Sequence, residues 1–562
     1  MDKNPAEVVE VICHFLLRGD IVRCLTVSKA YHQAFAPAVW RTIILFHAQE
    51  GVHGRRFPSG LGLQRYRHYI RVLHFSGYFP SEHMSLQGCA CLTKIIIQNW
   101  FSNHIVSAKY KLMLTNLPYR LANLVEANSG SLTHLVINTG QHQMTISDDL
   151  LLALLQCSFL TELEITSAVV PKENLELLLG VCAIVRTLKL ESVKLCRLPQ
   201  ELFKQEAGIM VDNEERSSQT LLLPEPRHIK LSLQVGIDDT YDAAMGSYED
   251  QALILRSCTN LNTLAWSGGV ISNGRAPTTK FLTALSADPW PLHRLECIDL
   301  LSDEFEDDAV ARLLAQMDQL RSLKVSSGLG VLSFKELIKE ADKGVRGQYQ
   351  RHCNTIEELW VETCYSLTSD KIQALLERCP NLHTLIASKI KALDIVRGKE
   401  WACRKMKRLR VCVEVDDSED NSGGDILDTS ATPVYASKAD GSADGRELFW
   451  NVERMIFSRL GALIHLQELH LTKSFHGTDD PPRTLNLKLG HGLELLVNLK
   501  CLRKFDCSTD YTQKLSLVDV RWMVEHWTAL EWLGCFVDCS KRATFLGIQT
   551  LLILKKIQYK LY

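Results

Sequence analysis

The chain lacks the features that would place it in a membrane or in a secreted compartment. It contains no apolar run long enough to cross a bilayer, which takes about 20 residues. Its first residues do not combine a basic region with an apolar one, so we expect no secretory signal. No Asn-x-Ser/Thr glycosylation sequence occurs either. We therefore expect no membrane partner.

An excess of charge of one sign is also missing. Lys and Arg together number 63, Asp and Glu number 65, and the formal net charge is −2. No global field therefore draws the chain to nucleic acid or to an acidic membrane. We expect neither as a partner.

Signatures of catalysis and of cofactor or metal binding are missing as well. The sequence has no Walker A loop, no Gly-x-Ser-x-Gly, no His-Glu-x-x-His and no Cys-x-x-Cys. The close pairs Cys89 with Cys91 and Cys535 with Cys539 lack a matching pair at zinc spacing. We expect no cofactor and no metal, and we interpret the chain as not being an enzyme.

What the chain does have is an internal repeat, clearest at residues 353–385. Ile356, Leu359 and Val361 alternate like a strand, and helical spacing follows, with Ser369 expected to cap the helix. The frame restarts 26 residues later at Leu382. One strand and one helix per unit of this length is typical of a leucine-rich repeat, which must stack on its neighbours to bury its apolar face.

The same frame, Cys-x-x-Leu-x-x-Leu-x-Leu with substitutions, recurs along the chain. A cysteine stands three residues before the first apolar position far more often than the overall cysteine content of 18 predicts. A core cysteine behaves as a small apolar group, so free thiols indicate a reducing compartment, cytoplasmic, nuclear or both. The cysteines in this position are Cys89, Cys157, Cys182, Cys258, Cys353, Cys379 and Cys403, and looser copies start at Ile70, Leu132, Leu295, Leu320, Leu466, Leu502 and Leu530.

These patterns predict an α/β fold of two parts. Residues 46–562 should form a leucine-rich-repeat solenoid with parallel strands on the concave side and helices on the convex side. Within it, residues 414–446 are acidic, rich in Ser, Gly and Ala, and without periodicity, so we expect a disordered insert. Residues 1–45 should form a small three-helix domain, with Ser28 capping the third helix and Pro37 ending it.

The N-terminal segment resembles an F-box. The resemblance rests on the Pro-x-Glu-Val-Val start, the Val-x-Lys step at Val27 and Lys29, and the late Trp40; the sequence departs from the family at Asn4 and Tyr31. The whole chain is similar to the F-box/leucine-rich-repeat proteins, particularly the large fungal group. The resemblance implies a substrate receptor of an SCF-type ubiquitin ligase, in which the F-box binds a Skp-type adaptor and, through it, a cullin. The implied adaptor-binding residues are Pro5, Val8, Val9, Ile12, Leu16, Ile21, Leu25 and Val27.

Two other interpretations stay open. The N-terminal helices could be a cap that shields the end of the solenoid, since terminal repeats need capping. The chain could also be a leucine-rich-repeat scaffold that is not linked to ubiquitination.

The unknown target protein should bind the concave face. In each frame the residues just before the last two apolar positions point away from the core. Two tryptophans among them are the expected anchors, because large aromatic side chains dominate interface energetics. The predicted target-binding residues are Glu358, Trp360, Thr384, Ile386, Arg408, Arg410, His470 and Trp532.

Overall fold

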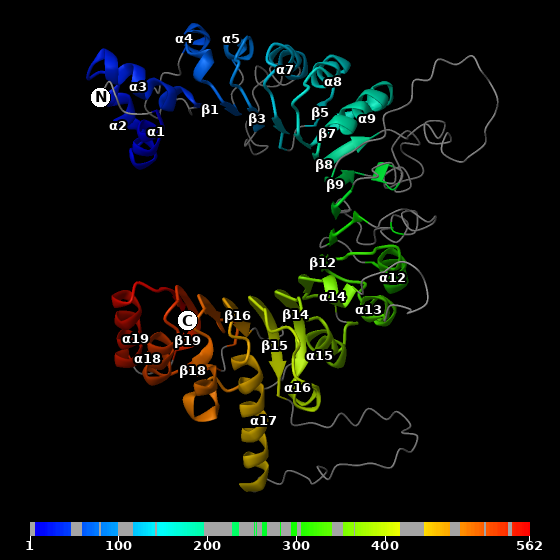
Figure 1. Ribbon diagram of the computed structural model, residues 1–562, viewed down its shortest axis with the longest axis vertical. Helices are drawn as coiled ribbons and strands as arrows, with labels where there is room; N and C mark the ends of the chain where they lie inside the picture. Colours follow the sequence, from blue (N-terminus) through cyan, green and yellow to red (C-terminus); the bar gives the residue numbers. More distant parts are fainter. Residues whose placement is uncertain are drawn as a thin grey trace, which may run out of the picture. The chain divides into compact units, whose positions relative to one another are not determined.

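The computed structural model divides into two compact units, residues 1–292 and 293–562 (Figure 1). It describes residues 6–46, 59–77, 80–98, 116–140, 143–195, 227–234, 252, 254–255, 261–266, 282, 294–300, 305–339, 352–364, 366–415, 443–471, 484–510, 513–537 and 542–562.

The first unit begins with three helices and continues as alternating strands and helices. Its described elements are α1 (Ala6–Phe15), α2 (Arg18–Cys24), α3 (Lys29–Trp40), β1 (Thr42–Phe46), α4 (Gly60–Arg65), η1 (Arg67–Tyr69), β2 (Val72–Ser76), α5 (Ser81–Met84), β3 (Lys94–Gln98), α7 (Leu117–Glu126), β4 (His134–Asn138), β5 (Met144–Thr145), α8 (Asp148–Leu155), β6 (Glu162–Thr166), β7 (Ala168–Val170), η2 (Lys172–Asn174), α9 (Leu175–Ile184), β8 (Thr187–Leu195), β9 (His228–Gln234) and β10 (Thr263–Trp266).

The second unit repeats the alternation. Its described elements are β11 (Cys297–Leu300), α12 (Asp307–Ala315), β12 (Ser322–Val325), α13 (Val331–Ile338), α14 (His352–Thr355), β13 (Glu358–Val361), α15 (Ser369–Arg378), β14 (Thr384–Lys391), α16 (Ala392–Arg397), β15 (Arg408–Glu414), α17 (Ala443–Gly461), β16 (Glu468–Leu471), η5 (Leu489–His491), η6 (Leu493–Asn498), β17 (Lys504–Asp506), β18 (Lys514–Leu515), α18 (Leu517–His526), β19 (Trp532–Val537), α19 (Arg542–Leu554) and β20 (Gln558–Leu561).

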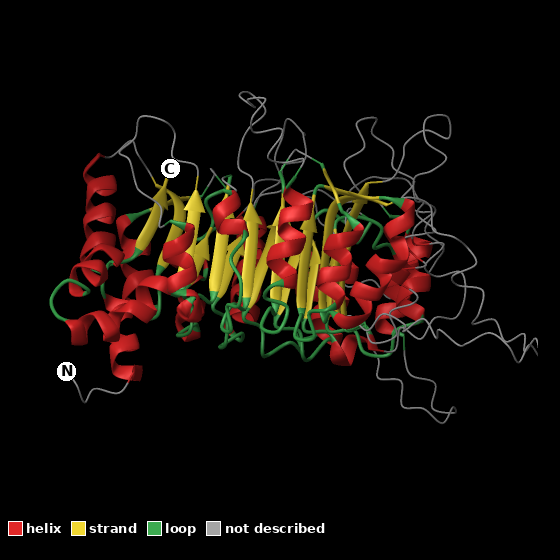
Figure 2. Cartoon of the chain, turned by 90° about the horizontal axis from the view of Figure 1, so that it is seen from above, coloured by secondary structure: helices red, strands yellow, loops and turns green. Residues whose placement is uncertain are grey.

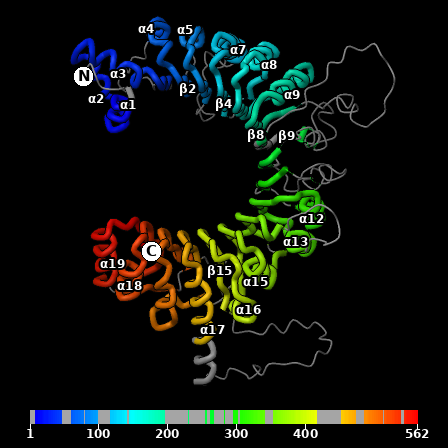
Figure 3. The backbone as a smooth tube through the Cα atoms, in the orientation of Figure 1, coloured from blue at the N-terminus to red at the C-terminus, as the bar shows by residue number. Residues whose placement is uncertain are grey.

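Each unit holds a parallel sheet whose strands follow one another in space as they do in sequence. The first sheet runs β1-β2-β3-β4-β6-β8-β9-β10. The second runs β11-β12-β13-β14-β15-β16-β17-β19-β20. Parallel neighbours need a crossover connection, and the helices supply it on one face of each sheet (Figures 2 and 3). We call the opposite face of the second sheet the open face.

Neighbouring strands share a recurring backbone arrangement at their first residues. One carbonyl of the preceding unit accepts hydrogen bonds from two consecutive N–H groups of the next. The carbonyl of Arg321, for example, accepts from Glu357 at 2.7 Å and Glu358 at 2.9 Å. The carbonyl of Glu357 then accepts from His383 at 2.8 Å and Thr384 at 3.0 Å. This repeated geometry shows that each strand–helix unit stacks on the one before it.

The apolar frame predicted from the sequence is confirmed wherever the structure describes it. In β13, Leu359 and Val361 are buried, and Ile356 just before the strand is 1% exposed. Wherever a predicted strand is present in the structure, the residues predicted to point into the core do so. The two registers agree because alternate residues of a strand must enter the core. The frame cysteines that the structure describes are buried, namely Cys89, Cys157, Cys182, Cys353, Cys379 and Cys403, while Cys258 lies outside the described residues.

The predicted helix boundaries need two corrections. Thr368 is the N-cap of α15, while the Ser369 hydroxyl accepts a hydrogen bond from the Lys391 N–H at 2.6 Å. The third helix does not end at Pro37 but continues to Trp40. Proline removes one hydrogen bond of the last turns, and the remaining bonds hold the helix. Ser28 caps α3 as predicted, accepting from the Tyr31 N–H at 3.2 Å.

The ends of the expected insert 414–446 are ordered. Glu414 closes β15 and forms an ion pair with Lys389 at 3.3 Å, and Val415 is buried. At the other end, α17 begins at Ala443. Residues 416–442 lie outside the described residues. The chain is thus an α/β protein built of stacked strand–helix units around parallel sheets.

Candidate functional site

The open face of the second sheet carries two rows of side chains in register across its strands. Strand pairing aligns Ser322, Glu358, Thr384, Arg408, Glu468, Lys504, Trp532 and Gln558 in the first row. It aligns Lys324, Trp360, Ile386, Arg410, His470, Asp506, Gly534 and Lys560 in the second. Every predicted target-binding residue therefore lies on one face, as strand alternation requires.

Trp360 is the most heavily contacted aromatic residue of this face. Its half-buried ring lies 4.7 Å from the Lys324 Nζ and 5.6 Å from the Arg408 guanidinium carbon. These are cation–π distances, so each cation stabilises the ring's position. Among the described residues, the buried indole N–H has no hydrogen-bond acceptor.

Ile386 is not available for binding, which corrects its predicted exposure. Its side chain is only 2% exposed. It stands between Trp360 on β13 and Arg410 on β15 in the same row, and these two larger side chains flank it. Strand alternation correctly predicts that Ile386 lies on the open face, but the size of its neighbours decides whether its side chain reaches solvent. Thr384, in the first row, is half-buried.

The charged residues of the face form ion pairs with one another. The Arg408 Nε lies 3.0 Å from Oε2 of Glu468, and the Arg410 Nη2 lies 2.7 Å from Oε1 of Glu362. Glu358 accepts a hydrogen bond from the Ser322 hydroxyl at 3.2 Å. Half-exposed pairs of this kind contribute little stability, about 0–1 kcal/mol each. They do fix the direction of the side chains around Trp360.

His470 is buried as well, contrary to the prediction that it faces a partner. It is 6% exposed and lies between two carboxylates, with Nδ1 3.4 Å from Oδ2 of Asp506 and Nε2 3.6 Å from Oε2 of Glu468. Asp506 also accepts hydrogen bonds from the N–H and hydroxyl of Ser508. Burial raises the pKa of the Asp506 carboxyl, but the hydrogen bonds from His470 and Ser508 outweigh it and lower that pKa to about 2.

Trp532 forms a second aromatic site on the face. Its half-buried ring lies 4.8 Å from the Lys504 Nζ and extends over Gly534, two residues along the same strand. Strand alternation in the sequence already predicts Lys504 on the same face as Trp532, but Lys324 beside Trp360 was not recognised. The signal was available, because Lys324 stands before an apolar frame position on the neighbouring strand.

The predicted adaptor-binding residues divide between core and surface. Val9 and Ile21 form a small core with Phe35, and Ile12, Leu16 and Leu25 pack against it. Apart from Phe35, these are predicted adaptor-binding residues. Their five side chains hold the three helices together, so their burial does not support the prediction that they form a contact surface. Val8 and Val27 are exposed, while Pro5 lies outside the described residues.

Further apolar residues are exposed on these helices and beside them, and of these the sequence analysis named only Val8 and Val27. We call them together the N-terminal apolar surface: Val8, Val11, Phe15, Leu17, Val22 and Val27, between 42% and 85% exposed. Val8, Val11 and Phe15 are spaced i, i+3 and i+7, so they share one face of α1. Val9, Ile12 and Leu16 have the same spacing, and each follows one of these residues directly in the sequence. The sequence of α1 thus contains two overlapping apolar stripes. This pattern indicates that one stripe packs in the core and the other is exposed.

The three helices are attached to the first repeat by side-chain contacts. The rings of Trp40 and Tyr66 stack at a centroid distance of 4.4 Å, and Arg41 forms an ion pair with Glu10. Tyr31, which departs from the F-box pattern, stacks on Phe35 at 5.8 Å within the small core.

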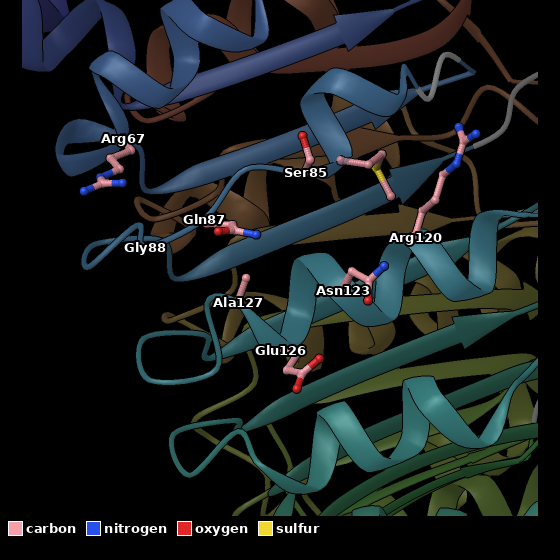
Figure 4. A pocket seen from close by; sticks show the side chains of 9 residues that line it. Arg67, Ser85, Gln87, Gly88, Arg120, Asn123, Glu126 and Ala127 are labelled. Atoms are coloured by element: carbon pink, nitrogen blue, oxygen red, sulfur yellow. The ribbon is translucent and has the colours of Figure 1, made fainter.

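The first unit has an open polar cavity of about 710 Å³ beside the short helix α5 (Figure 4). Arg67 and Gly88 line one part and Arg120, Asn123 and Glu126 of α7 another. No nucleophile–base pair is among the lining residues, so the cavity offers no evident chemistry.

The described residues contain no group of three or more His, Cys, Asp or Glu side chains placed to hold a metal ion. No helix among them is long and apolar enough to cross a membrane. The sequence matches no protein-family model and no curated protein.

Proposed function

We propose that this chain is the non-catalytic substrate-recognition subunit of an SCF-type ubiquitin ligase. In this proposal the three N-terminal helices are an F-box that binds a Skp-type adaptor, and through it a cullin. The remaining chain is a leucine-rich-repeat solenoid that holds a target protein. The complex would work in the cytoplasm, the nucleus or both.

The observation that carries the proposal is the N-terminal apolar surface. Phe15 is 85% exposed and Leu17 is 77% exposed, although three helices with so small a core have little stability to spare. An exposed apolar helix face, such as that of Val8, Val11 and Phe15, marks a protein–protein contact more often than a free surface. A helix face at the start of the chain, on the side away from its own core, is where an adaptor would bind.

The stacked units support the second half of the proposal. A parallel sheet with cysteine-containing apolar frames at repeat spacing is typical of a leucine-rich repeat. Its open face carries Trp360 and Trp532, large side chains that bury much area at little entropic cost. The chain would contribute proximity alone, by holding the target near a charged conjugating enzyme.

The alternative is a repeat scaffold that recruits no ubiquitin machinery. The contacts of Trp40 with Tyr66 and of Arg41 with Glu10 favour it, since they tie the helices to the first repeat as a cap. The departures at Asn4 and Tyr31 favour it too. In this alternative the N-terminal apolar surface would have another partner.

Copurification with a Skp-type adaptor tests the proposal. Changing Val11→Asp and Phe15→Asp puts charge on the N-terminal apolar surface while leaving the small core in place. The matched control, Leu61→Asp with Phe159→Asp, changes exposed apolar residues of α4 and of the turn after α8. We expect the first pair to abolish adaptor binding and the control to retain it. Failure of the unaltered chain to bind adaptor would favour the scaffold.

A further inference from the structure

The outer side of α19 is unusual for a surface helix because its first residue, Arg542, is its only charged residue. From Ala543 to Leu554 the sequence contains none. Leu546, Ile553 and Leu554 are nevertheless 48%, 58% and 74% exposed. Surface helices normally carry charged side chains opposite their apolar stripe. This helix is the last of the second unit and packs on α18 (Figure 1).

The strand that follows α19 lies at the edge of the second sheet. Among the described strands, β20 pairs only with β19. The N–H of Gln558 bonds to the Glu531 carbonyl at 2.8 Å, and that of Tyr562 to the Cys535 carbonyl at 3.2 Å. Strand alternation then directs the N–H and C=O groups of Tyr559 and Leu561 away from β19. An unpaired strand edge of this kind is a template for another strand.

The edge strand and the apolar helix form one continuous surface. The Gln549 Nε2 donates a hydrogen bond to the Tyr559 hydroxyl at 3.1 Å. Leu546, Gln549 and Ile553 are spaced i, i+3 and i+7, so they lie along one face of α19. A strand added beside β20 would therefore bring its inward side chains close to this face.

The charge of the surface restricts its partner. Residues 542–562 contain Arg542, Lys555, Lys556 and Lys560 and no acidic residue. On α18, Asp519 is buried in the helix cap and Glu525 is exposed. Glu531, just before β19, lies 3.6 Å from Arg503. The exposed carboxylates beside the surface are thus fewer than its four basic residues. A second copy of the chain would bring like charges together, which opposes self-association.

We propose that α19 and β20 bind an acidic, extended segment of a partner protein, which adds to the sheet as a further strand. Backbone bonds to Tyr559 and Leu561 would align it, its apolar side chains would cover Leu546 and Ile553, and its carboxylates would meet Lys555 and Lys556. The lysines would also attract an anionic lipid surface, but a lipid surface has no backbone N–H and C=O groups to pair with those of Tyr559 and Leu561.

The probe for the test is a fluorescent peptide of about nine residues, a length within the usual range of strands. Glutamate alternates in it with valine and isoleucine, and binding to the full chain is measured by anisotropy. We expect binding that weakens with salt and is lost when lysine replaces glutamate. Methylation of alternate peptide N–H groups should also abolish binding, because it blocks the ladder without altering the protein.

Charge-reversal variants localise the binding. Lys555→Glu with Lys556→Glu should weaken the peptide about tenfold or more, as expected for loss of charge complementarity. Lys335→Glu with Lys371→Glu makes the same change on α13 and α15 and should leave binding unchanged. No binding up to roughly 1 mM, or equal binding by both variants, overturns the proposal. So does binding of phosphatidylserine vesicles but not of peptide, which would identify a lipid surface, or dimer formation in sedimentation.

Discussion

The indole ring of Trp532 lies across the backbone of Gly534, two residues further along the same strand. A Cβ at position 534 would be 2.8 Å from Cζ3 of that ring and 2.7 Å from Oδ1 of Asp506. Glycine is required here by the close approach of the ring, since the backbone conformation is ordinary for a strand. The ring is thereby held flat on the open face beside Lys504.

Replacing Gly534 by alanine should therefore destabilise the protein. Either the ring moves from the sheet or the strand shifts, and overpacking of this kind costs about 1–3 kcal/mol. The measurement is the free energy of unfolding in urea. Gly490→Ala is the control, because a Cβ there meets nothing within 4 Å. Equal stability of the two variants would show that Trp532 is not fixed over Gly534.

Replacing Trp360 by alanine should weaken target capture more than it weakens the fold. The ring is half-buried and held mainly by Lys324 and Arg408, so its loss should cost the fold about 1 kcal/mol. An interface tryptophan contributes about 2 kcal/mol or more to binding. Melting curves and pull-down from a lysate, read by mass spectrometry, give the two values. A variant with wild-type capture would place the binding site elsewhere.

Acid should remove the contribution of Asp506 to stability. Its pKa is about 2 in the folded protein, below the value of about 3.9 for an unperturbed aspartate. The contribution is therefore complete above about pH 5 and is lost as the pH falls from about 5 towards 2, for a total of about 2–3 kcal/mol. Asp506→Asn should flatten the dependence of unfolding free energy on pH in this window. An unchanged slope would mean that the carboxylate is not stabilised by His470 and Ser508.

The cysteines should divide sharply in reactivity toward iodoacetamide. Burial raises the pKa of the Cys157 thiol to about 11 and that of Cys182 to about 12, so neither forms a thiolate at pH 8. Cys91 and Cys501 are exposed. Mass spectrometry of the labelled native chain should find the alkyl group on Cys91 and Cys501 within minutes. The two buried thiols should react only after denaturation, and rapid native labelling of either would contradict their core position.

The strands and their register follow from the amino-acid sequence alone. A frame such as Leu382 with Leu385 needs only the alternation of a strand to place both side chains in the core, and the frame cysteine falls in the same layer. Ser28 was predictable for the same local reason, since a hydroxyl at an N-cap needs only its own helix. The faces of the two tryptophans follow from their place between core residues.

Which residues of a face reach solvent depends on packing between strands and helices, which the sequence pattern does not show. Ile386 and His470 follow the same alternation as Trp360, yet neighbouring strands bury them, and strand alternation says nothing about the size of those neighbours. In α1, two interleaved apolar stripes were equally eligible for the core. Packing against Ile21 and Phe35 selected Val9 and left Phe15 exposed, because a helix can turn only one of its faces toward its partners.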